Sequence, residues 1–438
     1  MLGGIYAMTR EKFVALDWLR FALAMYLVLF HTFKEAYAPI REWPIVHSLL
    51  SIGFFSTSTF FVLSGFLLTH VYLRSVHHEH QFRLSTSKGM FWLKRFASLY
   101  PIHILALLLA LPLMMSSSGN MGEIMVTPNT NVWGPDKLDG VERALDLPAL
   151  LTNLGLHLTL THAWNPLYTA FNSPSWSLSA LMFFYLVFPF AAPMIGRHRR
   201  PILLLAALLS LYLIPALIMF FGYSNSVIGH GLLHRNPLIR LPEFLAGMTL
   251  HRIWLLHRTS LRQWLEAGWL PVALLVIAGS FATATWAHLT VRGPWYYLFH
   301  NGLLLPSQLM LVLLCVLYQP DSESRLSRAG QRLGVASLSI FALHIPLNII
   351  ASRAEKLLMG AIDVMTSDAP WSMLIPLASE ASRSIWLYPV FLIVIVAASV
   401  LFQEQLVNRM RGWIVRAGSH RRQAALVADD HYHEPQGS

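Results

Sequence analysis

Arg20 and His31 are two ionisable side chains within a hydrophobic segment at residues 13–33. They stand eleven residues apart, so an α-helix places them on one face, roughly 16 Å apart along its axis. Asp17 lies one turn before Arg20 and can pair with it. Ionisable residues inside a membrane are costly and typically serve function, so this segment is predicted to carry a functional site. The alternative is a salt bridge that packs helices together, with a histidine at the membrane interface.

The composition is that of a membrane protein. The chain has 438 residues, of which 55% are hydrophobic and only 12% are charged, and a soluble domain carries roughly twice that charged fraction. Ten apolar segments are each long enough to cross roughly 30 Å of hydrocarbon. The predicted fold is therefore all-α and polytopic, with about ten transmembrane helices. The predicted spans are residues 13–33, 49–73, 93–115, 175–195, 201–221, 232–253, 269–287, 297–318, 333–352 and 384–402.

The basic residues predict the orientation. If the N-terminus is cytoplasmic, most of the 32 lysines and arginines flank the inner ends of the spans or lie in the C-terminal tail. This asymmetry follows the positive-inside rule and places both termini inside. The net charge of +10 thus reflects topology, and its dispersal over many loops argues against a nucleic-acid partner. Cys315 is the single cysteine, so no intramolecular disulfide can form.

One integral-membrane domain is expected over residues 1–418, followed by a polar, disordered cytoplasmic tail at 419–438. The outer stretch 116–174 is long enough for a lid or an acceptor-binding surface, or else is a passive connector. Its apolar part, 147–160, is too short to span and is predicted to be an interfacial or re-entrant helix. A second outer loop is expected at 353–383, with the same two interpretations.

No metal site is expected. Two histidine clusters lack the carboxylate or cysteine arrangement that specifies a metal, so both are interpreted as solvated residues. These histidines are His77, His78 and His80 in an inner loop, and His431 and His433 in the tail.

A cationic pair, Lys94 and Arg95, lies where the chain re-enters the membrane, shortly before Tyr100 and Pro101. Such a pair can clamp phosphates, because arginine offers a bidentate fork. Ordinary flanking charge on the inner side is the alternative.

Polar residues interrupt four other spans and are candidates for lining a cavity or stabilising an oxyanion. A Ser-Gly pair in the second span allows another helix or a ligand to approach closely. A Ser-Trp-Ser-Leu-Ser run opens the fourth span, an Arg and a Glu three residues apart can pair in the sixth, and a second histidine lies at mid-depth in the ninth. The candidates are Ser64, Trp176, Ser179, Tyr185, Arg240, Glu243 and His344.

Taken in order, these motifs resemble those of the membrane-bound acyltransferase family 3. Arg20 and His31 match the family's Arg-x10-His signature. The other matching segments are residues 60–66 (FFxxSGF), 94–101 (an Arg-rich loop before Tyr-Pro), 176–189 (WSLSxE…FYxxFP), 240–248 (RxxEFxxGM) and 337–346 (SLSIYxxHxP). The resemblance covers roughly residues 13–350.

The resemblance implies a multi-pass protein of the bacterial inner membrane that moves an acetyl or other short acyl group from acyl-CoA to an exported polysaccharide or glycan. Acetyl-CoA would be a co-substrate, with no bound cofactor. The expected partners are the bilayer, acyl-CoA, the glycan acceptor and a polysaccharide synthesis or export complex. His31 would act as general base, with Arg20 and Asp17 deeper in the path of the acyl chain; an acyl-His31 relay is the alternative. Lys94 and Arg95 would meet the CoA phosphates, and Tyr100 would belong to the same acyl-CoA-binding site.

Two positions depart from the family pattern. Leu181 stands where the family usually has Glu, and Ser98 where it often has a second Arg. The first departure removes a carboxylate, for which Glu243 or Asp17 could substitute. The second leaves Lys94 and Arg95 to hold the CoA phosphates.

Two other functions compete with this prediction. A transporter or flippase for a lipid-linked sugar or small solute would also need intramembrane charges. The Arg20–His31 pair with a basic clamp favours thioester chemistry, and the sequence shows no inverted repeat of broken helices. An acyltransferase that acts on a small molecule or lipid is the other alternative, and residues 116–174 would decide the acceptor.

Overall fold

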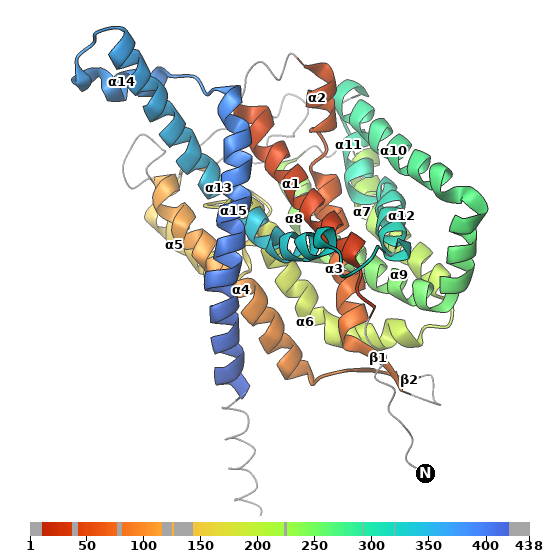
Figure 1. Cartoon of the computed structure of the whole chain (residues 1–438). Coiled ribbons are helices and arrows are strands. Elements are labelled where there is room, and N and C mark those ends of the chain that lie inside the picture. Colours follow the sequence, from red (N-terminus) through yellow and green to blue (C-terminus); the bar gives the residue numbers. More distant parts are fainter. Residues whose placement is uncertain are drawn as a thin grey trace, which may run out of the picture.

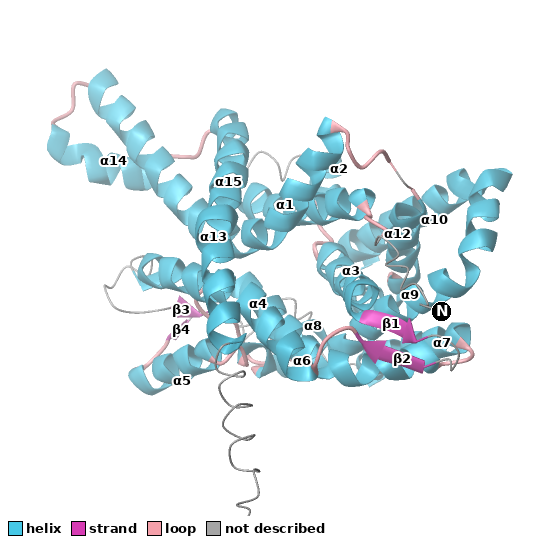
Figure 2. Ribbon diagram, turned by 60° about the horizontal axis from the view of Figure 1, so that its bottom comes forward, coloured by secondary structure: helices cyan, strands magenta, loops and turns pink. Residues whose placement is uncertain are grey.

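The protein is almost entirely helical over the residues that the computed structural model describes, which confirms the predicted all-α membrane class (Figures 1 and 2). These residues are 11–36, 43–76, 81–115, 125–126, 143–222, 226–291, 293–318 and 320–419. The predicted tail, 419–438, lies outside them except for residue 419, and both histidine clusters lie outside them: His77, His78 and His80, and His431 and His433. Two short antiparallel strand pairs accompany the helices: β1 (Leu73–Val76) with β2 (Gln81–Leu84), and β3 (Met125–Val126) with β4 (Arg143–Ala144).

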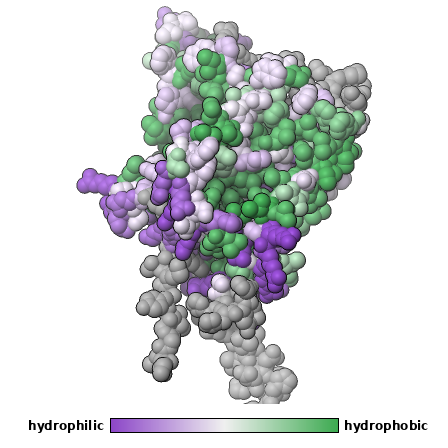
Figure 3. Space-filling model, turned by 90° about the vertical axis from the view of Figure 1, so that its right-hand side faces the viewer, coloured by the Kyte–Doolittle hydropathy of each residue, from purple (hydrophilic) through white to green (hydrophobic). Residues whose placement is uncertain are grey.

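Nine segments of the described chain are long and apolar enough to cross a membrane. All ten predicted spans overlap these segments. Two of them, 232–253 and 269–287, share the segment Val227–Val291, where the helix kinks at Gly268 with a φ of 86°. The face shown in Figure 3 carries a broad hydrophobic area, with hydrophilic residues gathered along its lower edge.

The helices that carry the candidate residues are bounded as follows: α1 (Val14–Ala36), α3 (Phe54–Tyr72), α4 (Lys88–Met115), α6 (Trp176–Arg197), α8 (Val227–Arg235), α9 (Pro237–Trp264) and α13 (Arg325–Thr366). The remaining α-helices are α2 (Pro44–Leu49), α5 (Leu147–Leu158), α7 (Pro201–Gly222), α10 (Leu270–Trp286), α11 (Trp295–Leu298), α12 (Leu305–Leu317), α14 (Leu374–Glu380) and α15 (Tyr388–Phe402).

Helices α3 and α9 cross with their backbones in contact. A Cβ atom added at Gly65 would collide with the carbonyl oxygen of Phe244, and one added at Gly247 would collide with that of Val62. Glycine is therefore required at both positions for this approach, as the Ser-Gly break in the second span predicts. The crossing holds Ser64 of α3 and the charged residues of α9 in fixed register.

The turn between α8 and α9 is fixed by local capping. The Asn236 side chain accepts hydrogen bonds from the backbone N–H groups of Leu238 and Ile239, and Pro237 occupies the first helical position. Ser226 caps α8 by accepting from the N–H of Gly229. These caps orient α8 against the start of α9.

The prediction of a loop at residues 353–383 is wrong, because most of these residues are helical: α13 continues to Thr366 and α14 follows it. Charged residues end the apolar run near residue 352, but they do not end the helix. Glu355 pairs with Arg383 at 2.9 Å, and Gly360 lets α14 pack closely at Ala378. The segment forms a helical hairpin at the upper left of Figure 1.

The short apolar stretch at 147–160 forms α5, as predicted, and a stack of histidines joins it to α4. The His157 and His162 rings stack with their centroids 3.9 Å apart, and the His103 ring of α4 lies 5.3 Å from His162. His103 Nε2 also lies 2.9 Å from the backbone oxygen of His157. All three rings are buried.

This stack predicts an acid-sensitive attachment of α5. Burial lowers the pKa of His157, which lies outside the membrane-spanning segments, from 6.5 to about 4. The detached or unfolded state therefore binds the proton first, and attachment weakens as the pH falls from about 6.5 toward 4. Hydrogen exchange of the α5 amides, corrected for intrinsic rates, should become faster when the pH is lowered from 7 to 5. The increase should be smaller in a His157→Phe variant. Equal protection at both pH values would contradict this.

Candidate functional site

Two cavities lie between α1, α3, α6 and α13, and they share one wall. The Arg20 cavity has a volume of about 340 Å³ and the His31 cavity about 220 Å³. Leu27, Thr57 and Phe341 line both. Along α3, the Arg20 cavity reaches Val71 near β1, whereas the His31 cavity lies at Gly53 and Phe54 near α2. The cavities therefore lie toward opposite ends of the helix bundle.

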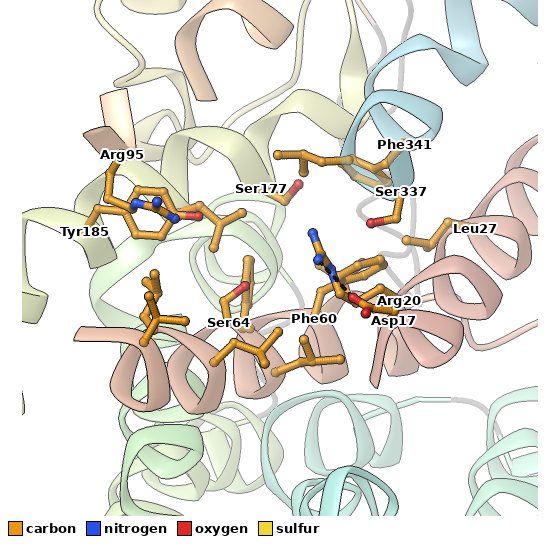
Figure 4. A pocket seen from close by; sticks show the side chains of 18 residues that line it. Asp17, Arg20, Leu27, Phe60, Ser64, Arg95, Ser177, Tyr185, Ser337 and Phe341 are labelled. Carbon is orange, nitrogen blue, oxygen red and sulfur yellow. Dashed lines mark ion pairs between the residues drawn. The ribbon is translucent and has the colours of Figure 1, made fainter. Parts of the chain in front are cut away.

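The Arg20 cavity is cationic at its polar positions. Arg20 enters from α1, with Nη1 3.7 Å from Asp17 Oδ1, and Arg95 enters from α4 beside Tyr185 on the other side of the cavity (Figure 4). The Arg95 Nη2 donates to the hydroxyl of Tyr72 at 2.9 Å. Two guanidinium groups face one carboxylate, so the cavity favours an anionic ligand. Most of its remaining lining is apolar.

The His31 cavity contains a histidine pair made by α1 and α13. His31 Nδ1 lies 3.1 Å from His344 Nε2 and 2.9 Å from the backbone oxygen of Leu27. His344 Nδ1 lies 2.5 Å from the backbone oxygen of Phe341, which can only accept. His344 therefore carries its proton on Nδ1 and accepts at Nε2, and His31 must donate from Nδ1. This leaves His31 Nε2 without a proton, able to accept one.

Close packing of α1 on α13 sets the position of this pair. A Cβ atom added at Gly334 would collide with the backbone and Cβ of Asp17, and one added at Gly330 would collide with the Trp18 ring. His344 is completely buried, whereas His31 is partly open to its cavity.

Arg240 and Glu243 form a buried ion pair away from both cavity linings. Arg240 Nε lies 3.1 Å from Glu243 Oε2, and both side chains are almost fully buried. Arg240 Nη2 donates to Ser58 Oγ at 2.8 Å, and the hydroxyl of Tyr212 donates to Glu243 Oε1 at 2.5 Å. Both Glu243 oxygens are thus engaged. Of the two carboxylates considered as substitutes for one at Leu181, only Asp17 shares a cavity with that position.

Besides Arg240, Glu243 and the buried His344, three further predicted site residues lie outside both linings. The Tyr100 hydroxyl donates to the backbone oxygen of Leu158 at 3.1 Å. Ser179 Oγ donates to the Leu160 oxygen at 2.6 Å and accepts from the Ala163 N–H at 3.2 Å, so it ties the α5 connection to α6. Lys94 lines neither cavity. Ser98 Oγ donates within its own helix, to the Lys94 oxygen at 2.8 Å.

The other predicted residues are divided between the cavities. Ser64, Tyr185 and Arg95 line the Arg20 cavity, and Trp176 lines the His31 cavity. Leu181 lies in the Arg20 cavity, where it supplies apolar surface in place of the family's usual carboxylate.

Sequence analysis missed one wall of the His31 cavity. This wall comes from α8 and the segment around α11, and the Trp176 ring lies 4.8 Å from the His234 ring. Two histidines four residues apart after the capping Ser226 were the available signal, since that spacing puts them on one helix face. The missed lining residues include His230, His234, His288 and Tyr296.

The fold and site define a multi-pass membrane protein in which a cationic cavity and a histidine cavity meet within the helix bundle. The chain belongs to the acyltransferase 3 family, because the profile of this acyltransferase domain matches residues 13–404. It is thus a multi-pass membrane member of this family.

One curated relative supports this assignment. The chain is 32% identical over 144 residues to the acyltransferase MdmB of Streptomyces mycarofaciens. The match covers 32% of this chain and 29% of that relative, so it spans less than a third of either protein. No solved structure matches the chain.

The buried ion pair makes a prediction about stability. Glu243→Leu alone leaves the Arg240 charge buried without its partner, which should cost about 3–5 kcal/mol. The double variant Arg240→Met with Glu243→Leu removes both charges and should recover most of this loss. Unfolding of the detergent-solubilised variants measures both effects. A double variant no more stable than the single one would contradict the pairing.

Proposed function

We propose that this protein is an O-acyltransferase that moves an acetyl group from acetyl-CoA in the Arg20 cavity to a glycan hydroxyl in the His31 cavity. The supporting observation is the shared wall of Leu27, Thr57 and Phe341, which brings a cationic cavity and an available imidazole nitrogen together. We further propose that the Arg20 cavity opens to the cytoplasm and the His31 cavity to the outer side of a bacterial inner membrane. An exported polysaccharide would then be the acceptor.

The donor end of this proposal rests on charge and shape. Arg95 lies at the α4 side of the Arg20 cavity and Arg20 at the α1 side, so both can bind anionic groups of CoA. The apolar lining suits the acyl chain and its linker. Leu181 adds no negative charge here, which leaves Asp17 as the only carboxylate among the described residues of the lining and keeps the cavity favourable to phosphate.

The chemical step follows from the protonation of His31. Nε2 takes the proton of the acceptor hydroxyl, whose oxygen attacks the thioester carbonyl carbon. The tetrahedral intermediate collapses, the C–S bond breaks, and the imidazolium returns the proton to the CoA thiolate. The atoms balance as one ester formed and one thiol released. Thr57, in the shared wall, is placed to donate to the oxyanion.

The direct test is thiol release from acetyl-CoA by the purified protein reconstituted in lipid, with candidate glycans, small alcohols and lipids as acceptors. His31→Ala should reduce release by about 10²–10⁴-fold, because it removes the general base. Arg20→Ala should raise the KM for acetyl-CoA. Arg262→Ala is the matched control, since that arginine is exposed and pairs with Glu11. Undiminished release by folded His31→Ala protein would contradict the proposal.

His344 should act as a positioning residue. Replacing it with Leu removes one of the two acceptors near His31 Nδ1–H and leaves the Leu27 oxygen alone to hold the ring with Nε2 unprotonated. We expect kcat to fall by roughly 10–100-fold with little change in the KM for acetyl-CoA. His344→Gln, which retains a hydrogen-bond acceptor, should recover part of the loss. Equal effects of both substitutions on kcat and KM would indicate a purely structural role.

A further inference from the structure

A second histidine pair faces the His31 cavity from the opposite helices. His234 of α8 lines the cavity, and its Nδ1 lies 2.9 Å from Nε2 of the buried His300. His300 lies in the π-helical turn Phe299–Leu303, in front of α12. The arrangement has the same form as His31 with His344: one histidine partly open to the cavity and one buried behind it.

The hydrogen bonds behind His300 decide where its proton lies. The Asn301 Nδ2 donates to the backbone oxygen of Leu233 at 3.0 Å, which fixes the amide so that Oδ1 faces His300 Nδ1 at 2.5 Å. Two acceptors at that distance would repel strongly, so His300 Nδ1 must carry the proton. The Arg240 Nη1 lies farther from the same His300 nitrogen, at 3.3 Å, while this guanidinium contacts Ser58 through Nη2 and Glu243 through Nε.

The protonation of His300 determines which nitrogen of His234 carries its proton. His300 Nε2 is an acceptor, so His234 must donate from Nδ1, and His234 Nε2 is left unprotonated. The His31 cavity therefore presents two imidazole acceptors, fixed by two separate networks. A third histidine, His230, is almost fully buried in the lining, and its Nδ1 has no hydrogen-bond partner among the described residues. A ligand that carries several hydrogen-bond donors is complementary to this wall.

We propose that His234 Nε2 binds a second hydroxyl of the acceptor, next to the hydroxyl that His31 deprotonates, so that the site selects vicinal diols as found on sugar rings. This rests on the proposed function, because it assumes that the acceptor reacts from the His31 cavity. Trp176 and Tyr296 supply ring faces in the same cavity against which the apolar face of a sugar can pack. His234 is thus a specificity residue that forms no covalent bond.

The kinetic test compares two probes, cis-1,2-cyclohexanediol and cyclohexanol, as acceptors for acetyl-CoA. The wild-type protein should prefer the diol in kcat/KM. His234→Asn keeps a nitrogen near the Nδ1 position but removes Nε2, so the preference should fall about tenfold, the equivalent of one hydrogen bond. His234→Gln, which can place an amide oxygen near the lost Nε2, should restore it. His198→Asn, in the exposed connection between α6 and α7, is the matched control.

A second measurement distinguishes failure of the His234 proposal from failure of the proposed function. In ¹⁵N-histidine-labelled protein, NMR should show several neutral histidines with bare Nε2, and one of these signals should be missing in the H234N variant. A preference for the diol that is unchanged in H234N, or a His234 signal with protonated Nε2, would overturn the proposal. If the wild type transfers no acyl group to any acceptor, the proposed function fails instead, and the NMR signal still decides the state of His234.

Discussion

The contact between His31 and His344, 3.1 Å across the interface of α1 and α13, is the constraint on which the rest of the site depends. Two imidazoles can share a buried hydrogen bond only if one donates and the other accepts. The backbone oxygens of Leu27 and Phe341 enforce that division by accepting the Nδ1 protons. The side chains of these same two residues form the wall between the cavities. The packing of α1 on α13 therefore sets both the position of the proposed base and the place where we propose that donor and acceptor meet.

The remaining buried polar groups follow the same physical rule. Within a bilayer, a polar group without an internal partner costs several kcal/mol, so charges must be paired and imidazoles hydrogen-bonded. Arg240, Glu243 and Tyr212 meet this requirement in a network that contributes structure and lines neither cavity. The network also reaches His300, because the Tyr212 hydroxyl lies 3.2 Å from the His300 backbone oxygen, and His300 in turn contacts His234 in the wall of the His31 cavity. The ion pair thus lies behind one wall of that cavity.

The sequence could predict those features that depend on local periodicity. Apolar runs located the spans, and helical spacing placed Arg20 and His31 on one face of one helix. The sequence also indicated His344 as a second histidine at mid-depth. It could not predict the contact of His344 with His31, because the register between two helices is set by side-chain packing. For the same reason Lys94 and Tyr100 were predicted in the donor site, whereas the rotation of α4 turns only Arg95 into the cavity. His234 was missed because its significance depends on His300, which lies 66 residues away.

Access to the two cavities is the most direct test of the central claim that they open to opposite sides of the membrane and meet at a shared wall. Cys315 is the single cysteine, so a Cys315→Ala background can carry either Ser64→Cys, in the Arg20 cavity, or Ser173→Cys, in the His31 cavity. A membrane-impermeant maleimide is then applied to sealed vesicles of each orientation, with and without coenzyme A. The account predicts that S64C is labelled from the cytoplasmic side only and is protected by coenzyme A, and that S173C is labelled from the opposite side only. Labelling of both variants from the same side would contradict it.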